Sequence, residues 1–177
     1  MPRYTLVLLC LLLQLGSSAQ YLADHVRPDP TEELYVAGER AYRSGDQVVA
    51  INLFDQVLEQ DPEHLNALLQ RGFCHSLNAS YDEAVDDFTA VIDHKNDHLW
   101  AYTSRGSAYS KLGKYDLAIA DFDRVIELDP KNEEAYNNRG WARKANGDPK
   151  GACKDWNSSK RLGNAEAKII LKNNRCK

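Results

Sequence analysis

The chain has 177 residues, of which 43% are hydrophobic and 27% charged, and its formal charge is −4 at pH 7. This length accommodates one domain or one short array of repeats. A mildly acidic chain without a cluster of lysines and arginines is poorly suited to bind the phosphate backbone of a nucleic acid, and equally an anionic membrane surface.

The first 19 residues are typical of a secretory signal peptide. They contain one arginine, Arg3, an apolar stretch over residues 6–15 and small residues at 17–19. We expect cleavage before Gln20 and a linker over residues 20–30. The apolar stretch is too short for a permanent membrane anchor. The mature chain is therefore expected to be exported, either to a periplasm or out of the cell.

Four kinds of residue recur with a period of 34 along the rest of the chain. Each unit has a glycine, then an alanine, then an aromatic residue, and closes on proline or asparagine. The members of the four columns are Gly38, Gly72, Gly106 and Gly140; Ala50, Ala84, Ala118 and Ala152; Phe54, Phe88, Phe122 and Trp156; and Pro62, Asn96, Pro130 and Asn164. These columns divide the chain into units over residues 31–64, 65–98, 99–132 and 133–166.

Each unit is predicted to form two amphipathic helices. In the first unit Leu34, Gly38 and Ala41 have the spacing of one helical face. The glycine allows the second helix to approach closely, and Phe54 fills the space beside it. Polar residues that can cap the second helices are Asp46, Ser80 and Asp148.

The period and the four columns resemble the tetratricopeptide repeat, a helix-turn-helix unit of 34 residues. The resemblance covers roughly residues 31 to 166 and implies an all-α solenoid of four repeats. One helical hairpin cannot bury both of its apolar faces, so neighbouring units must stack.

In the last three units an arginine precedes the glycine and an aspartate precedes the aromatic residue. The first unit has Ala37 and Leu53 at these two places. Because the two charged residues occur together and are replaced together, we interpret them as structural pairs between helices, within a unit or across a junction. A row of arginines that binds acidic ligands is the alternative. The expected pairs are Arg71 with Asp87, Arg105 with Asp121, and Arg139 with Asp155.

A capping helix and tail are predicted over residues 165–177. Gly163 can end the preceding helix and Asn164 can begin the last one. We expect the apolar residues 169–171 to face the array, because a helix of this kind closes the open end of a solenoid.

Three cysteines remain after removal of the signal peptide. Cys153 and Cys176 would meet if the last two helices run antiparallel, so we expect a disulfide between them. Cys74 is left over, and beside Gly72 and Phe73 it is interpreted as a small buried hydrophobic residue.

The sequence contains no phosphate loop, no nucleophile elbow and no zinc-protease motif. The one suggestive cluster is Asp93, His94, Asp97 and His98. These spacings would need a helix to hold a metal ion, but the segment is the turn between two units. We therefore expect a non-enzymatic protein with no catalytic residue, no metal site and no cofactor.

The resemblance also implies a concave groove, lined by the first helix of each unit, that binds an extended peptide or a partner helix. Aromatic faces and amides would supply buried area and hydrogen bonds there. An alternative is that Trp100 and Trp141 only cover the junctions between units. The candidate groove residues are Tyr35, Glu39 and Tyr42; Leu69, Gln70 and Phe73; Trp100, Thr103, Ser104 and Ser107; and Glu134, Asn137, Asn138 and Trp141.

Some members of the family grip acidic chaperone tails with a clamp of lysine, arginine and asparagine on these helices. The matching places in this chain hold Tyr35, Glu39, Gln70, Trp100 and Ser104. The clamp is therefore absent, and recognition of chaperone tails is not expected.

The expected function is that of an exported adaptor or scaffold, in a bacterial envelope, that binds a protein or peptide partner in its groove. The alternative is a structural component of an envelope complex, or an accessory subunit, joined through the outer faces. The sequence leaves the partner and the oligomeric state open.

Overall fold

A computed structural model describes residues 29–176 of the chain. The predicted signal peptide, and residues 20–28 of the predicted linker, lie outside the described residues. Over the described range the secondary structure is entirely helical, with nine helices. The helices are α2 (Pro30–Arg43), α3 (Gln47–Gln60), α4 (Leu65–Leu77), α5 (Tyr81–His94), α6 (Leu99–Lys111), α7 (Tyr115–Leu128), α8 (Glu133–Ala145), α9 (Pro149–Leu162) and α10 (Ala167–Asn173).

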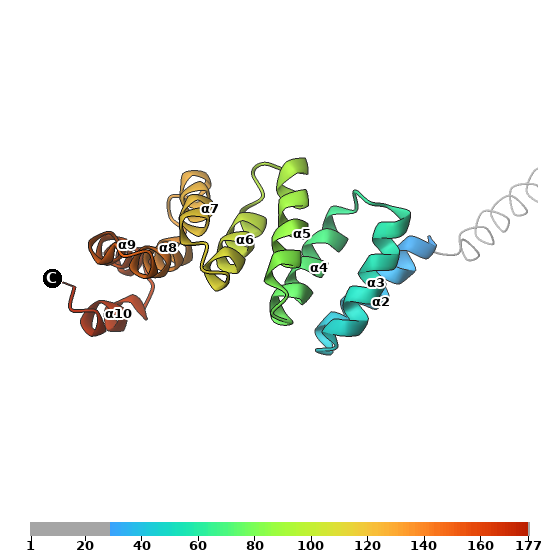
Figure 1. The fold of residues 1–177 in the computed structure, drawn as a ribbon, viewed down its shortest axis with the longest axis horizontal. Coiled ribbons are helices and arrows are strands. Elements are labelled where there is room, and N and C mark those ends of the chain that lie inside the picture. The colour runs from blue at the N-terminus through green and yellow to red at the C-terminus, as the bar shows by residue number, and fades with distance from the viewer. Residues whose placement is uncertain (1–28, 177) are drawn as a thin grey trace, which may run out of the picture.

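Eight of these helices form four hairpins that follow one another along the molecule, and α10 closes the far end (Figure 1). Each helix packs on the next one in the chain, and α4 also touches α2 and α6. The prediction of an all-α solenoid is confirmed. The first helix starts at Pro30, one residue before the predicted unit, because Asp29 caps it by accepting a hydrogen bond from the Thr31 N–H.

The recurring glycine and aromatic residue make each hairpin compact. A Cβ atom placed on Gly72 would lie 2.7 Å from the ring of Phe88, which is fully buried. The fourth unit replaces the phenylalanine by Trp156, whose indole Nε1 donates to the carbonyl oxygen of Asn137 at 3.3 Å. The bare glycine backbone thus makes room for the ring.

The turns inside the hairpins share one backbone hydrogen bond. The residue before each second helix donates its N–H to a carbonyl five residues earlier, in the pattern that ends helices on a left-handed residue. Asp46 and Asp148 add the expected side-chain caps. Ser80 makes no such bond, so that prediction is wrong, as the helix start is already fixed by the N–H of Ser80 bonded to the oxygen of His75 at 2.9 Å.

Histidines cap two of the first helices, which the sequence analysis did not foresee. The Nδ1 atoms of His64 and His98 accept hydrogen bonds from Ala67 and Ala101, each at 3.1 Å. Asn132 holds the same place in the fourth unit.

The C-terminal helix is shorter than predicted. Helix α9 ends at Gly163, whose φ is 117°, as expected. Asn164 then accepts hydrogen bonds from the N–H groups of Glu166 and Ala167, which delays the start of α10 to Ala167. Leu171 is buried, but Ile169 is 63% exposed. The expectation that residues 169–171 all face the array is wrong, because adjacent helical residues point about 100° apart.

A disulfide joins Cys153 of α9 to Cys176 after α10, with the two Cα atoms 5.5 Å apart. This is the expected pair, and it ties the chain end to the fourth hairpin. Cys74 is free and buried.

Candidate functional site

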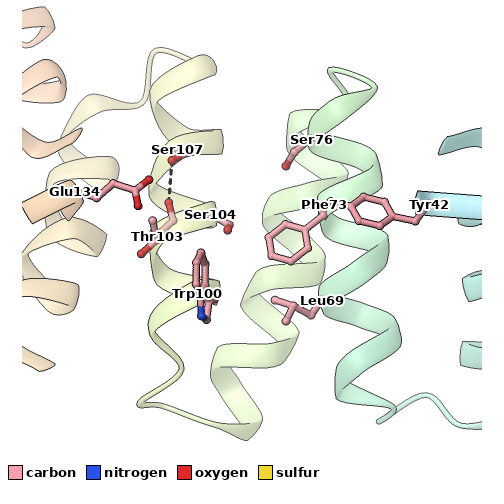
Figure 2. A pocket seen from close by; sticks show the side chains of 9 residues that line it. All are labelled: Tyr42, Leu69, Phe73, Ser76, Trp100, Thr103, Ser104, Ser107 and Glu134. Atoms are coloured by element: carbon pink, nitrogen blue, oxygen red, sulfur yellow. Dashed lines mark hydrogen bonds between the residues drawn. The ribbon is translucent and has the colours of Figure 1, made fainter. Parts of the chain in front are cut away.

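The concave side of the array carries an open hollow of about 620 Å³, which we call the central hollow (Figure 2). It lies mainly between α4 and α6, with one residue each from α2 and α8. Its lining consists of Tyr42, Leu69, Phe73, Ser76, Trp100, Thr103, Ser104, Ser107 and Glu134.

Helical spacing places these residues on one side of α4 and of α6. Leu69 and Phe73 are four residues apart and face Trp100 across the central hollow (Figure 2). The ring of Phe73 is held by Phe88, at 5.4 Å between centroids. Trp100 is 67% exposed. A large indole that water still surrounds gives the site apolar area that a ligand can cover.

The polar groups of the central hollow lie on α6 and α8. The Thr103 hydroxyl donates to the carbonyl oxygen of Leu99, and the Ser107 hydroxyl donates to that of Thr103, each at 2.9 Å. Glu134 brings a carboxylate from the first turn of α8. No lysine or arginine belongs to the lining.

The structure brings only part of the predicted groove together. Tyr42, Leu69, Phe73, Trp100 and Ser104 line the central hollow, as do Thr103, Ser107 and Glu134. The sequence analysis missed Ser76. Its signal was helical spacing, because Ser76 lies three residues beyond Phe73 on the same side of α4.

The remaining groove candidates make other contacts. Tyr35 packs against His64, at 5.0 Å between ring centroids, and its hydroxyl lies 3.4 Å from Glu39. Gln70 and Asn137 have buried side-chain oxygens without a hydrogen-bond partner among the described residues. Neither these residues nor Asn138 line the central hollow.

Trp141 is 43% exposed, so neither this indole nor that of Trp100 is sealed beneath a neighbouring unit. Its ring packs edge-on against Trp156, at 5.0 Å between centroids. The ammonium group of Lys144 lies 5.2 Å from the centroid of Trp141.

The arginine and aspartate columns form a ladder through the array. Within its unit, Arg105 donates two hydrogen bonds to Asp121, at 2.9 and 2.8 Å. Its third donor crosses the junction to Thr89 of the preceding unit at 3.0 Å. Arg71 with Asp87 and Arg139 with Asp155 repeat this arrangement, and reach back to Asp55 and Asp123 respectively.

The guanidinium groups are therefore occupied from both sides, which favours the structural interpretation over a row of anion-binding arginines. The acceptors across the junction were missed by the sequence analysis. They form a further column at the same period, with Asp55, Thr89, Asp123 and Asn157 at equivalent places.

Groups that could support chemistry are engaged or shielded. Between residues 29 and 176, no three His, Cys, Asp or Glu side chains are grouped so that they could hold a metal ion. The Nδ1 atom of His98, in the cluster considered for metal binding, accepts the cap hydrogen bond. Burial raises the pKa of the Cys74 thiol to about 11, so the nucleophilic thiolate is scarce at neutral pH.

None of the described helices is both long enough and apolar enough to cross a bilayer.

Three models of the tetratricopeptide repeat match the chain, over residues 35–97, 99–132 and 122–154. No curated protein sequence matches it.

Similar solved structures are also repeat proteins. Residues 41 to the end of MamA from Desulfovibrio magneticus RS-1 are 26% identical, with a TM-score of 0.74 over 85% of this chain and 88% of that one. A tetratricopeptide repeat protein from Thermus thermophilus is 16% identical, with a TM-score of 0.65 over 81% and 80%. The first such domain of Spaghetti (RPAP3), bound to the HSP90 peptide SRMEEVD, is 25% identical, with a TM-score of 0.64 over 70% and 98%.

Proposed function

The chain belongs to the tetratricopeptide repeat family, and from this premise we propose that it is a non-enzymatic scaffold that holds a protein or peptide partner in the central hollow. The observation that carries this proposal is an open concave site whose largest apolar side chain, Trp100, is 67% exposed. Aromatic anchors in a concave setting are typical of the residues that dominate binding energy at protein interfaces.

A peptide-bound member of the family supports the kind of ligand. The RPAP3 domain is similar to this chain over nearly its whole length and binds a short peptide. That peptide, SRMEEVD, is acidic, whereas the central hollow has no cation in its lining and includes Glu134. We therefore expect a different peptide for this chain.

We propose in addition that the protein works after export, in a periplasm or outside the cell. The first 19 residues have the pattern of a signal peptide. The pair Cys153–Cys176 supports this, because disulfides persist in oxidising compartments. Mass determination of the protein recovered from its native host tests the proposal, since export by this route predicts a chain that starts at Gln20.

The binding proposal is tested by crosslinking in the native host followed by mass spectrometry. Wild type is compared with Trp100→Ala, which we expect to lose at least one partner that wild type captures. Trp100 is the better target than Trp141, because Trp141 also packs on the buried Trp156.

Leu117→Ala is the matched control, since Leu117 is a similarly exposed apolar residue, 49%, on the second helix of a hairpin. Equal partner sets for wild type and Trp100→Ala, with a loss for Leu117→Ala, would favour attachment through the outer faces instead. Light scattering of the purified chain then shows whether the attached partner is a second copy.

A further inference from the structure

The hydrogen-bonding groups of the central hollow are biased toward acceptance. The hydroxyl hydrogens of Thr103 and Ser107 are already donated to backbone carbonyls, so only their oxygen lone pairs face a ligand. The carboxylate of Glu134 accepts and cannot donate when ionised. Ser76 and Ser104 can do either. A ligand that brings donors satisfies this lining better than one that brings acceptors.

The charge of the central hollow has the same bias. Glu134 is the only charged residue of the lining, and it makes no ion pair with another described residue. Cations elsewhere on the first helices are engaged or distant from it: Arg43 pairs with Glu39, and Lys144 lies over Trp141. Lys111, in the last turn of α6, does not line the central hollow.

Trp100 and Glu134 also border a second, smaller hollow of about 160 Å³, together with Leu99, Thr103 and Asn132. A ligand cation near Glu134 therefore comes close to the indole of Trp100. Both the carboxylate and the face of an indole attract a cation. An anion at this place would meet a negative carboxylate and no compensating lysine or arginine in either lining.

We infer that the partner segment bound in the central hollow carries a lysine or arginine beside an aliphatic side chain. The aliphatic side chain packs between Leu69, Phe73 and Trp100, and the cation lies against Glu134. This inference rests on the proposed function, and it names the chemistry of the partner rather than its identity.

The experiment is a selection of random peptides from a display library on the purified mature chain and on two charge-reversal variants, Glu134→Lys and Glu133→Lys. Both glutamates lie in the first turn of α8, so both changes have the same effect on helix and net charge. Only Glu134 belongs to the lining of a hollow. Wild type and Glu133→Lys are expected to enrich peptides with lysine or arginine next to leucine, isoleucine or valine.

Glu134→Lys is expected to lose this preference for basic residues. A selected peptide should bind Glu134→Lys roughly three- to five-fold more weakly than wild type, as for a solvent-exposed ion pair, with a smaller loss at high salt. Trp100→Ala should abolish binding of the same peptide.

The outcomes separate the two proposals. Peptides that depend on Trp100 but show no enrichment of basic residues, or the same enrichment on Glu134→Lys, overturn this inference and leave the scaffold function standing. Selections in which no enriched peptide depends on Trp100 contradict the proposed binding site itself.

Discussion

Arg105 and Asp121 show how single residues hold two units together. The Asp121 side chain is 6% exposed and that of Arg105 16%. Burial raises the pKa of the Asp121 carboxyl, and the hydrogen bonds from Arg105 act in the opposite direction. The ionised carboxylate is thus tolerated because the guanidinium is present.

Arg105→Ala is therefore expected to lower the free energy of unfolding by about 3–5 kcal/mol, since it leaves a buried carboxylate without its partner. The double change Arg105→Ala/Asp121→Leu reproduces the Ala37 and Leu53 of the first unit, and should cost less than about 1 kcal/mol. Urea unfolding followed by circular dichroism measures both. Arg124→Ala removes an exposed pair with Glu127 and serves as the control. Equal losses for the single and double changes would contradict the coupling.

His98 makes one helix start sensitive to pH. Burial, with a smaller contribution from Lys95, lowers the pKa of His98 below its usual value. The unfolded chain therefore takes up this proton at a higher pH than the folded chain. The cap stabilises the fold fully above about pH 6.5, and its contribution is lost as the pH falls through the folded-state pKa, because protonated Nδ1 cannot accept.

His98→Asn should keep the cap without the titration, as Asn132 does in the fourth unit. We expect its loss of stability between about pH 7 and pH 5 to be smaller than that of wild type, by up to about 1 kcal/mol. Urea midpoints at the two pH values provide the comparison. His94→Asn, an exposed change at the end of α5, is the control and should behave as wild type. An unchanged pH response in His98→Asn would show that the cap does not titrate.

At the scale of elements, the turn between α4 and α5 departs from the other hairpin turns. Gly45, Gly113 and Gly147 have φ angles of 82°, 73° and 84°, and Ala79 has the equivalent place with φ at 61°. A side chain in this left-handed region costs roughly 1–2 kcal/mol. Nothing lies within 4 Å of a Cβ built on the three glycines, so conformation alone decides the preference there.

Ala79→Gly is accordingly expected to raise stability by about 1 kcal/mol, even though glycine has more freedom in the unfolded chain. Gly113→Ala, the reverse change in the next unit, should lower it by a similar amount. Thermal unfolding of the two variants provides the measurement. A destabilised Ala79→Gly would mean that the methyl group makes a favourable contact in this turn.

Across the whole molecule, stability is local because the array is built from hairpins that contact their neighbours. The disulfide closes a segment with a sequence separation of 23 residues at one end of the array. Loop-closure entropy gives it about 3 kcal/mol of stabilisation.

Reduction of Cys153–Cys176 should therefore accelerate hydrogen exchange in α9 and α10 and leave α2 to α5 unchanged. Hydrogen exchange with mass spectrometry, with and without a reductant, tests this. Cys74→Ala in the oxidised chain controls for the remaining thiol, which is buried. Uniform acceleration along the chain would instead indicate a single cooperative unit.

The central hollow was only partly predictable from sequence. Leu69, Phe73, Trp100 and Ser104 could be found, because a helix with one face against its partner leaves the opposite face open. Tyr35 has the same register but packs on His64, and a capping histidine was not foreseen. Such contacts depend on how far each ring reaches toward its neighbour, which spacing along one chain does not contain.

The period of 34 residues by itself determined the family, the all-helical hairpins, the arginine and aspartate pairs and the cysteine pair, because a stacked repeat needs the same small, aromatic and charged residues at the same places in every unit. Only the tertiary structure decided which groove residues share one hollow, that Glu134 stands there as the single charge, and that the third donor of each arginine crosses a junction. The physical reason is that these features arise between units, where the distance between two side chains depends on the packing of helices that are far apart in sequence.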